Sequence, residues 1–139
     1  RTILEPDLAV SFQAEYRRGK EQLSPRLRQM MESGEKISAV AYQRALAEVP
    51  ILNRLLDPLL DQFDAILAPA TAGEAPRGLG STGSPVFCTT WTLLGTPAIT
   101  LPLIKGGSGM PLGVQLVGRR GEDAKLLRTA RWLEQRFAR

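Results

Sequence analysis

The protein has 139 residues, with 18 basic and 14 acidic side chains, a net charge of +4, one cysteine and no histidine. At this length one globular domain is the default, and about two-thirds of the unfolded surface can be buried on folding. The missing histidine excludes Ser-His-Asp and Cys-His catalysis and imidazole metal sites, and the single cysteine, Cys88, excludes an intramolecular disulfide and a thiolate metal cluster.

The chain begins with Arg1 rather than methionine, and it contains no signal-peptide pattern. It also lacks an apolar run approaching the roughly 18 residues of a membrane-spanning helix. We therefore expect a soluble cytoplasmic protein with no membrane partner, and a chain that is a piece of something longer.

The first two expected helices occupy residues 5–22 and 24–34. Apolar side chains recur at four-residue spacing through the first helix. The second has Ser24 as a capping residue, Pro25 in its first turn and Gly34 as its stop.

A long amphipathic helix is expected from Ser38 to about Leu60. Its leucines are interpreted as the buried face of a core helix. Pro50 and Pro58 lie inside the pattern, and each removes an amide donor, so we expect them to kink or break the helix. Residues 1–63 are thus predicted to be helical.

The second half, residues 64–139, has a different pattern. A buried strand over 64–69 leads into a loop rich in Gly, Pro, Ser and Thr. The other elements follow in order: a helix over 85–94 that stops at Gly95, strands over 98–104 and 112–117 joined by a glycine-rich turn, and a terminal helix from Glu122. The predicted fold class is α/β, with helices packed on a small mixed sheet in a single segment over 1–139.

Charge is unevenly distributed, with a net of −1 over residues 1–64 and +5 over 65–139. A basic region can indicate nucleic-acid binding, but here the basic residues occur singly or in pairs, without interleaved aromatic side chains. We therefore expect no nucleic-acid partner. No Asp or Glu occurs between Glu74 and Glu122, so this stretch offers no carboxylate pair for acid–base catalysis.

Three short motifs suggest chemistry but fit structural roles better. Residues 78–83 match G-x-G-x-x-G, yet they lie eight residues beyond the preceding strand and lack the acidic partner of a dinucleotide site. Ser108 and Lys105 share a tight turn, where neighbours seldom meet as nucleophile and base. Cys88 has no histidine to activate it and is interpreted as a buried structural thiol. From the residues alone we predict no catalytic group, no metal and no cofactor.

A longer ordered series of motifs is more specific than any of these. It runs D-A-I-L-A-P-A-T (64–71), A-P (75–76), Phe87, G-T-P-A-I-T-L-P (95–102) and M-P-L-G-V-Q-L-V-G (110–118). The series resembles the C-terminal region of amidase-signature hydrolases, and the resemblance extends over about residues 23–137. It implies that the segment belongs to a larger α/β/α amidase core.

Members of this family hydrolyse carboxylic amides through an acyl-enzyme with a Ser–cis-Ser–Lys triad, which needs neither metal nor histidine. The triad lysine and the Gly/Ser-rich signature lie in the first half of family members, and nothing in this chain matches them. The resemblance therefore implies a C-terminal piece of an amidase that contains no catalytic residue and is inactive alone.

The resemblance leaves this chain a share of the substrate pocket, at Thr82, Pro85, Val86 and Thr89. Ordinary packing is the alternative role for each of them. Members that belong to glutamyl-tRNA amidotransferase, as its amidase component, carry an acidic residue near Pro85 and an asparagine where Thr92 stands. The resemblance therefore favours a small apolar or aryl amide over glutamine as the substrate of the parent enzyme.

Two hypotheses stay open. In the first, the chain supplies scaffold and pocket walls to a larger amidase. In the second, it is a free-standing, non-catalytic interaction module with the same fold. Removing the first half of an amidase would expose a sheet edge and apolar surface, so we expect the isolated chain to self-associate.

Overall fold

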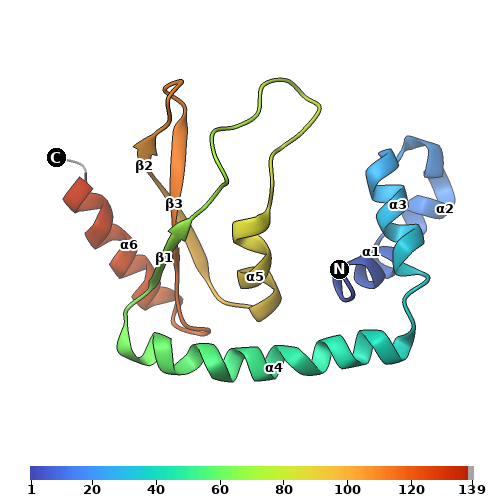
Figure 1. Ribbon diagram of the computed structural model, residues 1–139, viewed down its shortest axis with the longest axis horizontal. Helices are drawn as coiled ribbons and strands as arrows, with labels where there is room; N and C mark the ends of the chain where they lie inside the picture. The colour runs from blue at the N-terminus through green and yellow to red at the C-terminus, as the bar shows by residue number, and fades with distance from the viewer. Residues whose placement is uncertain (138–139) are drawn as a thin grey trace. The chain divides into compact units, whose positions relative to one another are not determined.

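The computed structural model describes residues 1–137, and the chain divides into two compact units, Arg1–Ile51 and Leu52–Arg139 (Figure 1). Helix α4 (Ala39–Gln62) contributes residues to both units. The single-segment organisation expected from the sequence stays a prediction.

The first unit contains three helices before α4 and one short 3₁₀ turn: α1 (Leu4–Ser11), α2 (Gln13–Gly19), η1 (Lys20–Gln22) and α3 (Pro25–Gly34). The single helix expected over 5–22 is therefore wrong, because the backbone at Phe12 leaves the helical region with ψ of 17°. Helix α3 begins as predicted, since Ser24 Oγ accepts a hydrogen bond from Leu27 N at 3.3 Å.

Helices α1 and α3 pack closely through a small residue. A Cβ added at Gly34 would overlap the backbone carbonyl of Glu5, so only glycine allows this approach. Glu5 is buried there and forms an ion pair with Arg1 at 3.1 Å. Ala9 and Met31 supply the buried apolar side chains of this contact.

Helix α4 runs for 24 residues through both prolines, so the break that they could have caused is absent. Pro50 and Pro58 are exposed. The carbonyl groups that lose an amide donor to each proline therefore lie on a side of the helix that water can reach. Buried residues of α4, Asn53 and Leu60, belong to the second unit.

The second unit is built on a three-stranded sheet of β1 (Ile66–Pro69), β2 (Ala98–Lys105) and β3 (Pro111–Val117), in the order β1-β3-β2. The α/β class with helices packed on a small sheet is confirmed. The pairing differs from the mixed sheet expected, because β3 pairs antiparallel with both described neighbours. The short turn between β2 and β3 is the physical reason for one of these pairings, since parallel strands need a much longer crossover.

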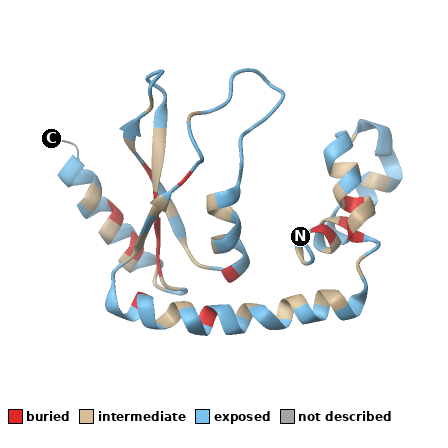
Figure 2. Ribbon diagram, viewed as in Figure 1, coloured by how far each residue is buried: buried red, intermediate tan, exposed pale blue. Residues whose placement is uncertain are grey.

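The two faces of the sheet carry different helices. On one face, α6 (Asp123–Phe137) buries Leu126 and Ala130 against Leu101 and Leu116. Gln115 alternates with Leu116 along β3 and therefore points to the other face, where it contacts α5 (Val86–Leu94). Figure 2 shows the buried residues of this unit gathered along the sheet and α6.

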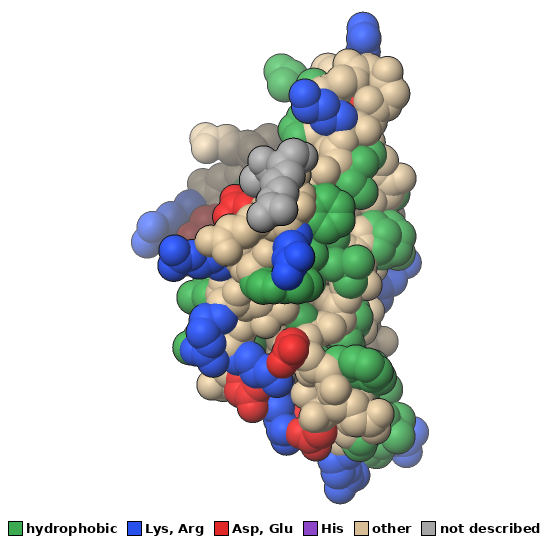
Figure 3. Space-filling model, turned by 90° about the vertical axis from the view of Figure 1, so that its left-hand side faces the viewer, with side chains coloured by type: hydrophobic (Ala, Val, Ile, Leu, Met, Phe, Trp, Pro, Cys, Tyr) green, Lys and Arg blue, Asp and Glu red, His purple; other side chains and the backbone are tan. Residues whose placement is uncertain are grey.

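Helix α5 ends as predicted at Gly95, whose φ of 66° is in the left-handed region. No helix within residues 1–137 is long and apolar enough to cross a membrane. On the face drawn in Figure 3, Lys and Arg side chains are scattered among acidic and hydrophobic ones.

Candidate functional site

The site expected from the sequence lies where the loop over residues 70–85 enters α5. The loop leaves the end of β1, extends away from the sheet and returns at Pro85, which is the N-cap residue of α5 (Figure 1). Proline suits this position because its fixed φ favours the first helical turn and its missing N–H costs nothing there.

The structure brings three of the four predicted pocket residues together and leaves the fourth in the loop. Pro85, Val86 and Thr89 lie on the exposed first turn of α5, and Thr89 Oγ1 donates a hydrogen bond to the Pro85 carbonyl at 2.9 Å. Thr82 is exposed in the loop before the helix. Their role in binding substrate stays a prediction.

Gln115 of β3 holds the first turn of α5 from beneath. Its side chain is 4% exposed, and Nε2 donates to the Phe87 carbonyl at 3.1 Å. The Cys88 thiol lies 3.9 Å from Gln115 Oε1 and donates to the Ala70 carbonyl at 3.5 Å. Cys88 is half-buried. This polar junction joins β3, α5 and the residue that follows β1.

Asn53 of α4 holds the other end of α5. With its amide in the orientation that satisfies both groups, Nδ2 donates to the Leu94 carbonyl at 3.2 Å and Oδ1 accepts from Arg120 Nη1 at 3.1 Å. The Leu94 carbonyl belongs to the last turn of the helix, where carbonyl groups have no partner within the helix. Asn53 is also 4% exposed.

Glu74 connects the start of the loop to the turn between β2 and β3. Its carboxylate accepts a hydrogen bond from Ser108 N at 2.9 Å and another from the Ser108 hydroxyl. A Cβ at Gly106 would overlap the Glu74 side chain, so glycine makes room for it. The donors of Ser108 hold the pKa of the Glu74 carboxyl below its usual value. The hydroxyl that could have served as a nucleophile with Lys105 is thus paired with a carboxylate.

A shallow groove of about 460 Å³ lies beside this connection, and its lining is almost wholly apolar. Phe87 contributes from α5, and the other walls come from β1, the start of the loop, β2 and β3. Thr82, Pro85, Val86 and Thr89 are not among its lining residues. The groove therefore begins on the opposite side of the first turn of α5 from the predicted pocket residues.

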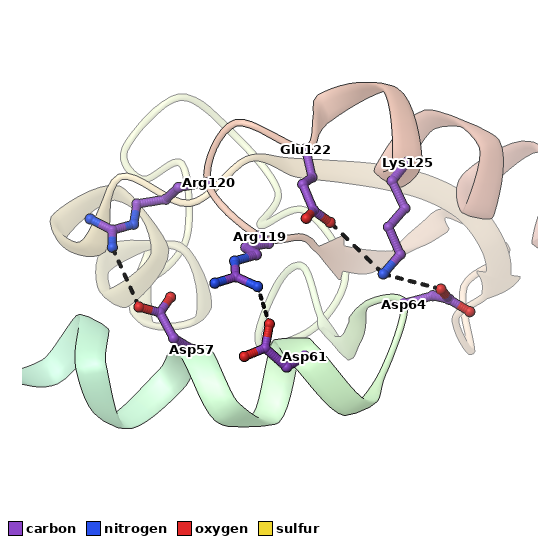
Figure 4. Close-up of polar contacts among 7 residues, drawn as sticks. All are labelled: Asp57, Asp61, Asp64, Arg119, Arg120, Glu122 and Lys125. Atoms are coloured by element: carbon purple, nitrogen blue, oxygen red, sulfur yellow. Dashed lines mark hydrogen bonds and ion pairs between the residues drawn. The ribbon is translucent and has the colours of Figure 1, made fainter.

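Ion pairs join the C-terminal part of α4 to the segment between β3 and α6 (Figure 4). Arg119 pairs with Asp61, Arg120 with Asp57 at 3.8 Å, and Lys125 with Asp64 at 3.3 Å. All these side chains are partly exposed, so the pairs add modestly to stability and do not form an acid–base site. Within residues 1–137, no group of three or more His, Cys, Asp or Glu side chains is placed to hold a metal ion.

Sequence reasoning missed the two buried amides. Gln115 was noted only within a motif, and Asn53 was not singled out. A signal was present in both cases, because each is an uncharged polar residue inside an otherwise apolar buried stretch, where a side chain needs a hydrogen-bond partner.

Comparison with known proteins is consistent across sequence and structure. The model of the amidase family matches residues 9–127. Over 104 residues the chain is 46% identical to the amidase-family subunit of the glutamyl-tRNA(Gln) amidotransferase of Roseobacter denitrificans, covering 68% of this chain but only 21% of that protein.

Two solved structures share the fold. The crystal structure of an amidase superposes with a TM-score of 0.86 at 32% identity, covering 97% of this chain and 34% of its own. A bacterial aryl acylamidase of the amidase signature enzymes superposes with a TM-score of 0.67 at 19% identity, covering 90% of this chain and 30% of its own. The chain thus spans about a fifth to a third of the length of these relatives.

Proposed function

The chain belongs to the amidase family, and from this premise we propose that it supplies scaffold and part of the substrate pocket to an amide hydrolase. One observation carries the proposal. Almost the whole chain superposes on an amidase, yet it accounts for about a third of that enzyme. Most of an amidase is therefore needed in addition to these residues.

We propose that the chain has no amidase activity alone. The Ser–cis-Ser–Lys chemistry implied by the family resemblance would come from residues outside this sequence, through an acyl-enzyme. Supporting this, the hydroxyl of Ser108 is paired with Glu74, and no carboxylate occurs between Glu74 and Glu122. The cytoplasmic location stays a prediction.

The substrate that we propose for the complete enzyme is a small amide with an apolar or aryl group. The first turn of α5 presents Pro85, Val86 and Thr89, none of which carries a charge that could hold an α-ammonium group. A glutamine substrate would need such a carboxylate, and the nearest along the chain, Glu74, already accepts the two donors of Ser108.

The experiment compares the chain alone with the chain combined with the N-terminal two-thirds of an amidase. Hydrolysis of p-nitroacetanilide and of glutamine is measured in both. We expect no turnover by the chain alone, and turnover of the anilide in preference to glutamine in the combination. Turnover by the chain alone that is lost in Ser108→Ala would overturn the proposal of inactivity, and preference for glutamine would overturn the proposed substrate.

A specific observation keeps the second function, a non-catalytic interaction module, under test. Leu52, Leu55 and Leu59 are exposed and share one face of α4, followed by exposed Phe63. We propose that this face causes the isolated chain to self-associate. Sedimentation at micromolar concentration should show species larger than a monomer, and Leu55→Glu should reduce them. A clean monomer for the unsubstituted chain would contradict this proposal.

A further inference from the structure

Helix α5 is weakly anchored by apolar packing. Of its nine residues only Leu94 is buried, while Phe87, Cys88 and Trp91 are half-buried and the others are exposed. Figure 2 shows the helix as largely exposed or intermediate, with a buried residue at its end. A helix of this length has little stability of its own, so other contacts must fix its position.

The buried amides provide these contacts at both ends. Gln115 Nε2 donates to the Phe87 carbonyl in the first turn, and Asn53 Nδ2 donates to the Leu94 carbonyl in the last. The two carbonyl groups are about 10 Å apart along a helix. The donors come from different elements, β3 and α4, so α5 is held from two directions.

Both amides are placed where an apolar side chain would otherwise be favoured. Each is 4% exposed, and a buried amide is costly unless its hydrogen-bonding groups are satisfied. Each has partners for both its oxygen and its nitrogen, since Gln115 Oε1 faces the Cys88 thiol and Asn53 Oδ1 accepts from Arg120. This full satisfaction gives each amide a directional hold on α5 that an aliphatic side chain lacks.

We propose that Asn53 and Gln115 are positioning residues that fix the two ends of α5 and so set the placement of its exposed first turn. The functional meaning rests on the proposed function, in which Val86 and Thr89 on that turn line a substrate pocket. The positioning itself does not depend on that function, because it follows from the contacts within residues 53–120.

The chain contains its own reporter of α5, since Cys88 is the only cysteine and is half-buried against the Ala70 carbonyl. The rate of its reaction with 4,4′-dithiodipyridine is measured in the full chain under native conditions. Asn53→Leu leaves the Leu94 carbonyl without a partner, and we expect labelling to be about tenfold faster. Gln115→Leu removes one of two donors to Phe87, and we expect an increase of about fivefold.

The double variant should show about the product of the two increases, because the contacts lie at opposite ends of the helix. Thr92→Val is the matched control. It removes a hydrogen bond to the Cys88 carbonyl within α5 but none to a neighbouring element, and labelling should not change. Native labelling rates in both leucine variants would overturn the proposal.

Gln115→Glu separates positioning from simple space filling and does not require comparison between differently folded variants. Above the pKa of the new carboxyl, two acceptors face each other at Phe87 and α5 should be released. At lower pH the protonated carboxyl donates again, and slow labelling should return. Cys88 is the titratable group that contacts residue 115, so rates are normalised at each pH to those of the urea-unfolded chain.

A labelling rate for Gln115→Glu that does not change with pH, after this normalisation, would overturn the positioning role of residue 115. The labelling results are also independent of amide hydrolysis. Altered labelling with no turnover in the combined enzyme would contradict the proposed function alone. Turnover with unaltered labelling would contradict the positioning role alone.

Discussion

Polar side chains on the surface make many of the long-range contacts in residues 1–51, whereas a buried apolar cluster and two buried amides organise the residues from Leu52 onward. In the first unit, Glu32 joins two helices by accepting from Tyr16 at 2.7 Å and pairing with Lys20 at 2.9 Å. In the second, Leu101, Leu116, Leu126 and Ala130 form a continuous core. The difference predicts that the two units respond differently to cavities, to crowding and to salt.

The sequence provides separate probes for this comparison. Trp91 and Trp132 both lie in the second unit, and Tyr16 and Tyr42 both lie in the first. Tryptophan fluorescence therefore reports unfolding of one unit, and tyrosine near-ultraviolet dichroism that of the other.

Leu116→Ala should give the largest effect, because Leu116 is 4% exposed at the centre of the core. We expect the free energy of unfolding reported by tryptophan to fall by about 3 kcal/mol in urea titrations. Leu79→Ala, at a fully exposed leucine, is the control and should change it little. An equal shift of the tyrosine transition would break the comparison, since it would show that the chain unfolds as one cooperative unit.

Gly34→Ala is the corresponding test of the first unit. The added Cβ overlaps the Glu5 backbone, so α1 and α3 must separate, and the tyrosine-reported stability should fall by about 2 kcal/mol. Gly73→Ala, where nothing lies within 4 Å, controls for the loss of a glycine. Unchanged tyrosine-reported stability would show that this helix contact is not fixed by Gly34.

Asp61→Asn should have a small effect. It removes the partner of Arg119 in a pair whose side chains are 54% and 37% exposed, and such pairs contribute about 0.5 kcal/mol. The tryptophan-reported difference from the native chain should disappear in 1 M salt. A difference that persists in high salt would show that the contact acts through packing rather than charge.

The smallest expected effect is a change in titration, with Glu32 and Glu74 as one carboxyl from each unit. Both have a pKa below the ordinary value of 4.5, Glu32 chiefly through its hydrogen bond to Lys20 and Glu74 chiefly through the Ser108 hydroxyl. Because a lowered pKa favours the folded state, the contribution of each is complete above pH 4.5 and lost as pH falls through the folded pKa.

High salt distinguishes these two carboxyl groups. A charged partner is screened by salt and a neutral donor is not, so 1 M salt should raise the pKa of Glu32 and leave that of Glu74 nearly unchanged. Side-chain carbon NMR measures both pKa values. Ser108→Ala should raise the pKa of Glu74 alone, and salt sensitivity of Glu74 equal to that of Glu32 would contradict the distinction.

The elements of the second unit were predictable to within a few residues, because proline, glycine and strand-like apolar runs mark their ends. The first unit was harder. A continuous apolar spacing suggested one helix over 5–22, but the chain departs from helical geometry at Phe12. Pro50 and Pro58 had the opposite outcome, since α4 continues through both. Local propensity alone does not determine whether a helix ends, because contacts with the rest of the unit also contribute.

By itself, the sequence determined the family, through motifs whose order survives without any knowledge of contacts, and it determined the α/β class through the change from helical to strand-like periodicity. Only the tertiary structure decided what Asn53, Gln115 and Glu74 do. Their partners Leu94, Phe87 and Ser108 are 28 to 41 residues away along the chain. Hydrogen bonds of that separation depend on how strands and helices meet, and sequence periodicity records only which face a residue occupies.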